Sequence, residues 1–115
     1  MSERPFPDGF YDGVRRFAAG EYFEAHEAFE DCLDAVEDDE RWDLLVALIQ
    51  VAVGYHKLVS GHPGGERMLG LGNEKLAPFP AVAWGVAVER LRRRVAVDQE
   101  RGTTGPVPPR IDLVD

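Results

Sequence analysis

The sequence has a single cysteine, Cys32, and only two lysines among its thirteen basic residues. One cysteine excludes a disulfide bond within the chain, and no charged segment followed by an apolar one opens the sequence. We therefore expect a cytoplasmic protein. The longest apolar run, around residues 44–53, contains Gln50 and is too short to span a bilayer, so we also expect no membrane anchor.

Positive charge is scarce overall. Thirteen basic residues against 21 acidic ones give a formal net charge of −8 at pH 7. Such a surface repels phosphate backbones, which argues against nucleic-acid binding. The exception is a basic cluster, Arg90 with residues 92–94, which lies near the end of an expected helix and is interpreted there as a solvated charged face. An acidic chain that favours arginine over lysine also suggests a salt-adapted source.

Strand signals are missing too, because no segment alternates apolar and polar residues and no hairpin turn separates two such segments. Apolar residues recur instead at helical spacing. We expect five helices, over about residues 8–19, 40–60, 65–76 and 80–99 and, after Gly20, a second one whose apolar stripe runs from Tyr22 to Val36. Asp8, Asp38 or Asp39 would be helix caps, and Pro80 would lie in the first turn of the fifth.

These expected helices predict an all-α fold, a compact multihelical bundle of about five helices. Two helical hairpins, joined at Gly20 and at "GHPGG", would make the body and the fifth helix would close it. Residues 1–100 would form a single domain, which is the usual size for one core. Residues 101–115 would form an extended, proline-rich tail that docks on the body through Ile111, Leu113 and Val114.

The third expected helix is apolar nearly all round, which predicts a central position covered by neighbours on most sides. Its polar residues Gln50 and His56 would then lie in the interior and need hydrogen-bond partners.

Two polar residues also border the apolar stripe of the second helix. His26 and Glu30 are four residues apart, hence on one face, and an ionised carboxylate there is costly unless something compensates its charge. If the second and third helices pack antiparallel, His56 could approach this pair. Two imidazoles and a carboxylate suit Zn, Fe or Mn. Gln50 could join such a site only from its edge.

A structural interpretation stands beside this one, in which His26 and Glu30 satisfy each other and a neighbouring tyrosine or backbone group. The "HEAFE" segment lacks the second histidine of the zinc-protease H-E-x-x-H motif, and no E-x-x-H pair marks a di-iron bundle. Cys32 lies on another helical face, so we interpret it as a packing residue.

The segments "FAAGEYFEAHEAFED" and "ALIQVAVGYHKLVSGHPGG" resemble the DUF309 family, bacterial and archaeal proteins of unknown function. The similarity runs from about Phe17 to Leu76. It implies an all-α multihelical fold and a motif, H-x-x-x-E-x-x-(W/Y), that has been suggested to bind metal. That motif falls on His26 and Glu30, whereas its aromatic position falls on Leu33 and departs from the pattern.

A second similarity concerns packing alone. Gly20, Tyr22, Ala25, Phe29 and Leu33 follow the spacing of tetratricopeptide helical hairpins, although the pattern is not repeated along the chain. Grooves between such hairpins commonly hold peptides or partner helices.

Two hypotheses follow. In the first, the protein binds a divalent metal through His26, Glu30 and His56, conceivably as a metal-dependent hydrolase with Glu27 as base. In the second, it is a non-enzymatic interaction domain that self-associates as a homo-oligomer, and the same residues form a buried network that fixes helix register.

Overall fold

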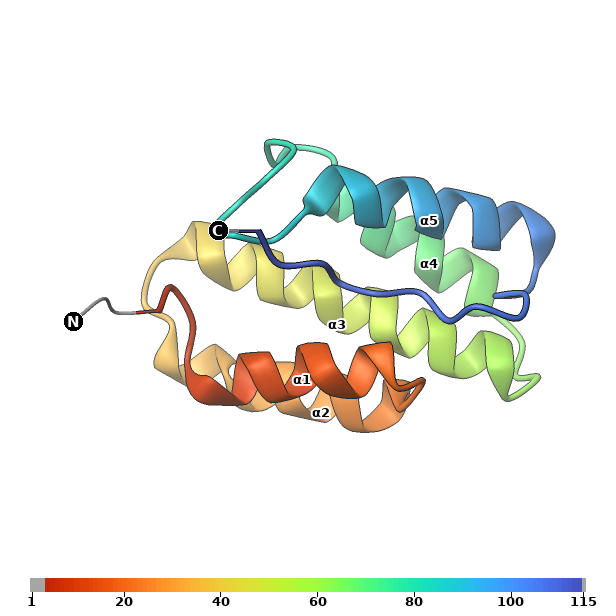
Figure 1. Cartoon of the computed structure of the whole chain (residues 1–115), viewed down its shortest axis with the longest axis horizontal. Helices are drawn as coiled ribbons and strands as arrows, with labels where there is room; N and C mark the ends of the chain where they lie inside the picture. Colours follow the sequence, from red (N-terminus) through yellow and green to blue (C-terminus); the bar gives the residue numbers. More distant parts are fainter. Residues whose placement is uncertain (1–3, 115) are drawn as a thin grey trace.

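The computed structural model describes residues 4–114, and it is all-helical as the sequence predicts (Figure 1). The first hairpin pairs two helices and the second pairs a long helix with a shorter one, after which a last helix closes the bundle. In chain order these elements are α1 (Asp8–Ala18), α2 (Tyr22–Asp31), the 3-10 turn η1 (Leu33–Ala35), α3 (Asp39–Val59), α4 (Gly65–Leu76) and α5 (Val88–Arg101).

Local chemistry explains where the first helices end. Gly20 follows α1 with φ 81°, a left-handed conformation that glycine adopts without steric cost, and it lets α2 fold back antiparallel to α1. The side chain of Asp38 accepts a hydrogen bond of 3.0 Å from the backbone N–H of Arg41 and caps α3, as predicted. Asp8, by contrast, is the first residue of α1 rather than its cap.

The fifth helix begins eight residues later than its apolar spacing predicts. Residues 80–87 form a turn in which Ala83 and Val86 exchange two backbone hydrogen bonds, of 3.0 and 2.8 Å. Trp84 and Gly85 have φ values of 46° and 80°, which a right-handed helix cannot contain. The prediction of a helix from Pro80 was therefore wrong, because the apolar residues here pack as a turn.

The C-terminal segment lies along the body. Ile111 is buried, the backbone N–H of Ala87 donates to the carbonyl of Asp112 at 2.9 Å, and Val86 bridges to Leu113. Leu113 and Val114 themselves remain exposed. In Figure 1 this segment runs between α5 and α1, across the near side of α3.

Glycines let α3 and α4 approach to backbone contact. A Cβ added to Gly65 would lie 2.8 Å from the backbone nitrogen of Leu58, and one added to Gly72 would lie 3.1 Å from that of Val51. Gly54 on α3 meets Leu69 in the same way, at 2.9 Å. The two helices are therefore locked together along most of the length of α4.

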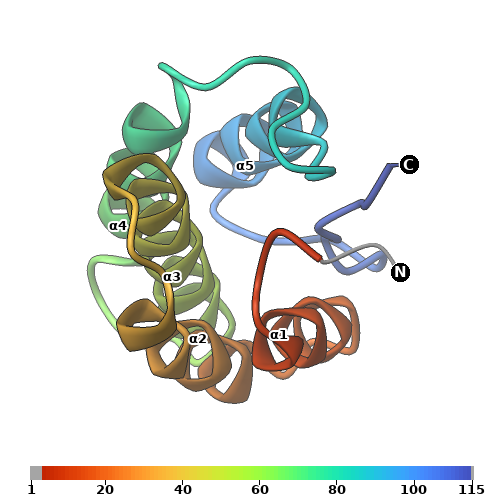
Figure 2. The same ribbon diagram turned by 90° about the vertical axis from the view of Figure 1, so that its left-hand side faces the viewer.

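The core covers only one side of α3. Eight of its 21 residues are buried, on the side that faces the rest of the bundle: Leu44, Leu45, Ala47, Leu48, Val51, Ala52, Gly54 and Tyr55. In Figure 2, α4, α3 and α2 form a curved wall with α5, α1 and the C-terminal segment on its inner side, and no helix among residues 4–114 lies on its outer side, where only the loop between α3 and α4 bulges out.

Apolar residues also run along the outer side of α3, among them Trp42, Val46, Ile49 and Val53. By length and composition alone α3 could cross a membrane, a property that core helices of soluble proteins share. The apolar run over residues 44–53 was judged too short to span a bilayer, but it underestimates the length of the helix, because α3 extends well beyond the run at both ends. The apolar outer side of α3 is therefore the first surface that needs an explanation.

We expect Gly65→Ala to lower the free energy of unfolding by about 1–3 kcal/mol, because the added Cβ meets backbone atoms of α3 that cannot move aside. Gly9→Ala is the matched control, since its Cβ would make an ordinary 3.5 Å contact with Cys32 and alanine favours a helix by up to about 1 kcal/mol. Urea unfolding of both variants measures the difference. Equal stabilities would contradict the close packing of α3 on α4.

Candidate functional site

His26 and Glu30 lie together at the edge of α2, but they are not buried together. His26 Nδ1 lies 2.6 Å from the carbonyl oxygen of Phe23, so it carries the proton and donates it there. His26 Nε2 is 3.8 Å from Glu30 Oε2, and the side chains are 18% and 62% exposed. A surface pair of this kind contributes little to stability.

His56 comes near this pair, as the antiparallel packing of α2 and α3 predicts, but it lies at the edge of the outer side of α3 rather than in the interior. The Phe23 ring contacts both imidazoles, with centroid distances of 4.9 Å to His26 and 5.3 Å to His56. His62 follows at 6.3 Å from His56. The result is a partly exposed row of four rings.

These side chains, as they lie, do not fit a three-ligand metal site. Among residues 4–114 no three His, Cys, Asp or Glu side chains are grouped to hold a metal ion. His26 already donates from one nitrogen to Phe23, and the Phe23 ring packs against the imidazoles of both helices. The ligand roles of His26, Glu30 and His56 therefore stay a prediction, as does that of exposed Glu27 as a base.

The structure also does not support a buried network at this place, because Glu30 and Glu27 are exposed. Gln50, the other polar residue of α3, is half buried, and its Oε1 is buried with no hydrogen-bond partner among the described residues. Its amide is thus the unsatisfied group of this region, and it lies on the outer side of α3.

The buried polar network lies elsewhere and was missed from the sequence. The Tyr55 hydroxyl on α3 donates to Asp98 Oδ2 on α5 at 2.6 Å, and Arg94 Nε donates to the same oxygen at 2.7 Å. Asp98 is only 2% exposed. Arg94 also donates to the carbonyl of Thr104 at 2.8 Å and to that of Val107. The network joins α3, α5 and the C-terminal segment.

This network corrects the interpretation of the basic cluster as a solvated face. Arg90 and Arg93 are exposed, as expected, but Arg94 is turned to the buried carboxylate of Asp98. The sequence does contain a signal for this ion pair, because Arg94 and Asp98 are four residues apart on one helix and can therefore pair. Burial raises the pKa of Tyr55, and its hydrogen bond to Asp98 raises it further, so the phenol stays protonated and remains a donor.

Tyr22 extends the network with an aromatic contact. Its ring stacks on that of Tyr55 with a centroid distance of 5.4 Å, and burial raises its pKa as well. Phe17 packs edge-on against both rings. Tyr22 of the "GEY" segment therefore serves packing between α2 and α3.

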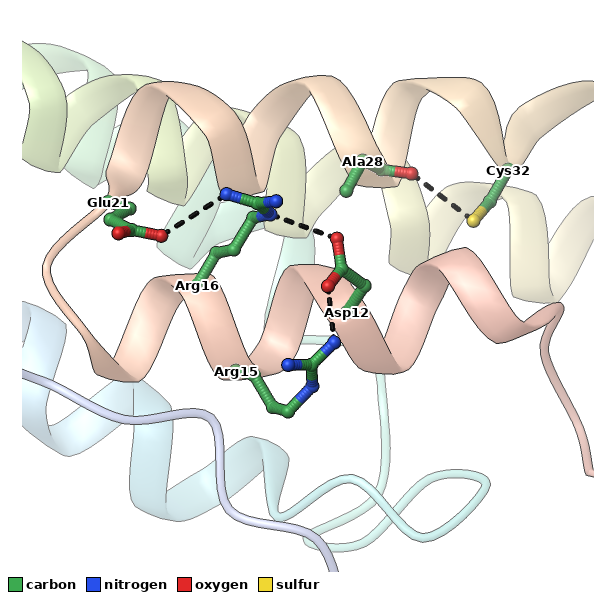
Figure 3. A network of polar contacts seen from close by, with 6 residues as sticks. All are labelled: Asp12, Arg15, Arg16, Glu21, Ala28 and Cys32. Atoms are coloured by element: carbon green, nitrogen blue, oxygen red, sulfur yellow. Dashed lines mark hydrogen bonds and ion pairs between the residues drawn. The ribbon is translucent and has the colours of Figure 1, made fainter.

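Cys32 is a packing residue, as interpreted from the sequence. Its thiol is buried, donates to the carbonyl of Ala28 at 3.3 Å, and has a pKa raised by burial, which keeps it unreactive (Figure 3). The same view shows Arg16 between Asp12 and Glu21, which ties α1 to the start of α2. Its guanidinium hydrogen bond to Asp12 lowers the pKa of that carboxyl.

A hollow of about 610 Å³ opens near the start of α3. The rings of Phe79 and Trp84 form part of its wall, and the charged side chains at it, Glu40, Asp43 and Lys75, come from α3 and α4. All three of those charged residues are exposed. The hollow lacks the buried polar groups that fix a ligand's orientation.

The outer side of α3 carries a regular pattern instead. Five residues recur at alternating steps of four and three, which is the a/d spacing of a coiled-coil seam: Trp42, Val46, Ile49, Val53 and His56. Trp42 is 42% exposed and the other four are partly exposed. We call these five residues the α3 seam. Exposed Phe23 of α2 packs beside its His56 end.

Sequence reasoning missed the α3 seam because it assumed that a helix apolar on all sides is covered on all sides. The seam could have been found by separating the two apolar faces. Leu44, Leu48, Val51 and Tyr55 follow one line along the helix, and the α3 seam follows the opposite one.

A comparison with protein families finds a match. The model of DUF309, described as a domain of unknown function, matches residues 10–69. This confirms the resemblance seen in the sequence. The matched region contains all of α2 and α3 and ends within α4, so it includes the α3 seam but not Arg94 and Asp98. No match was found among curated proteins.

We expect Tyr55→Phe to lower the free energy of unfolding by about 1–3 kcal/mol, because the buried carboxylate of Asp98 loses a donor. Tyr11→Phe, at a partly buried ring with no hydrogen bond to its hydroxyl among the described bonds, should change stability by less than about 0.5 kcal/mol. Chemical denaturation at pH 7 compares them. Equal effects would show that the Tyr55–Asp98 bond adds nothing.

The raised pKa of Tyr55 and Tyr22 predicts a loss of stability in alkali. In the unfolded chain these phenols ionise near their ordinary pKa of about 10, whereas the fold keeps them protonated, so the stabilisation is complete below about pH 10 and is lost above it. Urea midpoints across this range should fall, and Tyr55→Phe should flatten the fall. A midpoint that does not change with pH would contradict the assignment.

Proposed function

The chain belongs to the DUF309 family, which brings no activity with it, and we propose that the protein is a non-enzymatic helical interaction domain that self-associates through the α3 seam. The observation that carries this proposal is the heptad spacing of Trp42, Val46, Ile49, Val53 and His56 on a side of α3 that no helix covers among the described residues.

The seam is suited to packing against another helix. From Trp42 to His56 it spans fourteen residues, or about 21 Å of helix. Val46 and Val53 occupy the a positions and Ile49 a d position, so the centre of the seam presents apolar side chains to a second helix. The helix is also held rigid by the backbone contacts with α4, so little ordering is needed on binding.

The size of the seam sets the expected affinity. Three aliphatic residues and one tryptophan form a small contact, and association also costs translational and rotational freedom. We therefore expect a dissociation constant of about a micromolar. Each copy carries a net charge of −8, so long-range repulsion opposes association unless salt of about 0.15 M screens it.

The metal hypothesis gains no comparable support. It rests on the spacing of His26 and Glu30, whose closest ring nitrogen and carboxylate oxygen are 3.8 Å apart, while no third ligand joins them among the described residues. Metal analysis of protein purified without chelator distinguishes the metal hypothesis from the proposed interaction domain. A full equivalent of metal that is lost in His26→Ala would overturn our preference for the interaction domain.

We expect Val53→Glu to abolish self-association, because it places a charge in the middle of the seam while Val53 is already partly exposed in the monomer. Val82→Glu is the matched control, since Val82 is an exposed valine in the turn before α5. Sedimentation equilibrium gives the mass of each variant, and circular dichroism checks that each keeps its helices. A monomeric wild type at about 100 times the expected dissociation constant would overturn the proposal.

A further inference from the structure

We infer that the second copy binds antiparallel, so that the two α3 helices are related by a two-fold axis that passes beside Gln50. This inference rests on the proposed self-association and adds to it an orientation, a register and the residues that set both. The inference follows from three residues along one side of the α3 seam, Asp43, Gln50 and Lys57, which we call its flank. The two charged residues lie at equal distances from Gln50.

The flank consists of the residues that follow each d position, namely Asp43, Gln50 and Lys57. They are seven residues apart, so they lie in one line along the side of the seam next to α4. Asp43 at one end is acidic, Gln50 in the middle carries an amide, and Lys57 at the other end is basic. In an antiparallel pair these e positions face their counterparts on the second helix, in reverse order.

Charge complementarity therefore selects the antiparallel arrangement. With the axis at Gln50, Asp43 of each copy faces Lys57 of the partner subunit, which gives two ion pairs of opposite charge. In a parallel pair each e position would instead face a g position of the partner. Asp43 would then face Asp38 of the partner subunit and Lys57 would face Ala52 of the partner subunit, so neither would gain a neighbour of opposite charge. The flank thus adds two ion pairs to the antiparallel orientation and none to the parallel one.

The apolar residues of the seam agree with this register to within about one residue. Val46 and Val53 stand at equal distances from the midpoint between Ile49 and Gln50, so each packs on the other in the partner subunit. Trp42 and His56 lie seven residues on either side of Ile49, so Trp42 also comes near His56 of the partner subunit. A surface that matches itself under a two-fold rotation is what an isologous dimer requires.

Gln50 supplies a second, independent observation. Its Oε1 is buried without a hydrogen-bond partner, which is a cost in the isolated subunit. Across the axis it faces Gln50 of the partner subunit, whose amide has both donors and an acceptor. Rotation of the terminal amide, which is a soft torsion, brings the two groups together. A polar pair of this kind commonly fixes register in helix pairs.

Cysteine cross-linking tests the orientation directly. In a Cys32→Ala background, so that no native thiol remains, Val46→Cys and Val53→Cys are made separately and oxidised alone and as a mixture. We expect covalent dimers in the mixture, which pairs residue 46 of one copy with residue 53 of the other, and about tenfold less from either variant alone.

The outcomes separate the inference from the proposed function. Dimers from Val46→Cys alone at the yield of the mixture would show a parallel pair, which overturns the orientation and leaves self-association standing. No cross-link in any sample, together with a monomeric wild type, would overturn both. Circular dichroism of each variant checks that the helices are retained.

A charge exchange tests the register without cysteines. Asp43→Lys and Lys57→Asp should each weaken the dimer by about tenfold, because each creates two like-charge contacts, and the double variant should restore the wild-type dissociation constant. Sedimentation equilibrium measures all four proteins. Single variants with wild-type affinity, or a double variant weaker than both, would overturn the register.

Discussion

The packing of α3 against α4 at backbone distance is the constraint on which the rest of the structure depends. Gly54, Gly65 and Gly72 leave no room for side chains between these helices, so α4 takes a fixed position along one flank of α3. α2 packs on the other flank. Because α4 and α2 pack on its two flanks, α3 has one face toward the core and one face toward solvent, and apolar residues line both faces.

The core side of α3 is completed from a distance by α5. Tyr55 donates a hydrogen bond to Asp98, and Arg94 donates both to the same carboxylate and to the carbonyl of Thr104. The buried carboxylate thereby joins α3, α5 and the C-terminal segment. A buried carboxylate is tolerated only when it is paired and hydrogen-bonded, as this one is. The polar chemistry of the interior is therefore used for assembly of the fold, whereas the outer face of α3 carries the regular apolar pattern.

Much of this architecture could be predicted from the sequence. Helical spacing and turn residues gave four of the five helices to within a few residues, and Asp38 was identified as a cap because cap chemistry is local. The fifth helix was placed too early, since the left-handed backbone at Trp84 depends on pairing with residues near the C-terminus. Contacts of that range leave no local signal.

The sequence-based prediction of the candidate site was limited in the same way, by contacts between segments that are distant in the sequence. Helix periodicity correctly put His26 beside Glu30 and brought His56 near them, but it could not show that the Phe23 ring would contact both imidazoles. Nor could it show which of the two apolar faces of α3 would remain uncovered, because that depends on where α5 and the C-terminal segment pack. The family match adds the expectation of a shared fold for residues 10–69 and leaves the chemistry open.

The central claim is that the uncovered face of α3 pairs with itself, antiparallel. Isotope-filtered nuclear Overhauser spectroscopy on a mixture of labelled and unlabelled protein observes contacts between copies alone. The account predicts intermolecular signals between the methyl groups of Val46 and Val53 and none between Val46 and Val46. Intermolecular signals confined to residues outside the α3 seam, or no such signals at concentrations where the protein is dimeric, would contradict it.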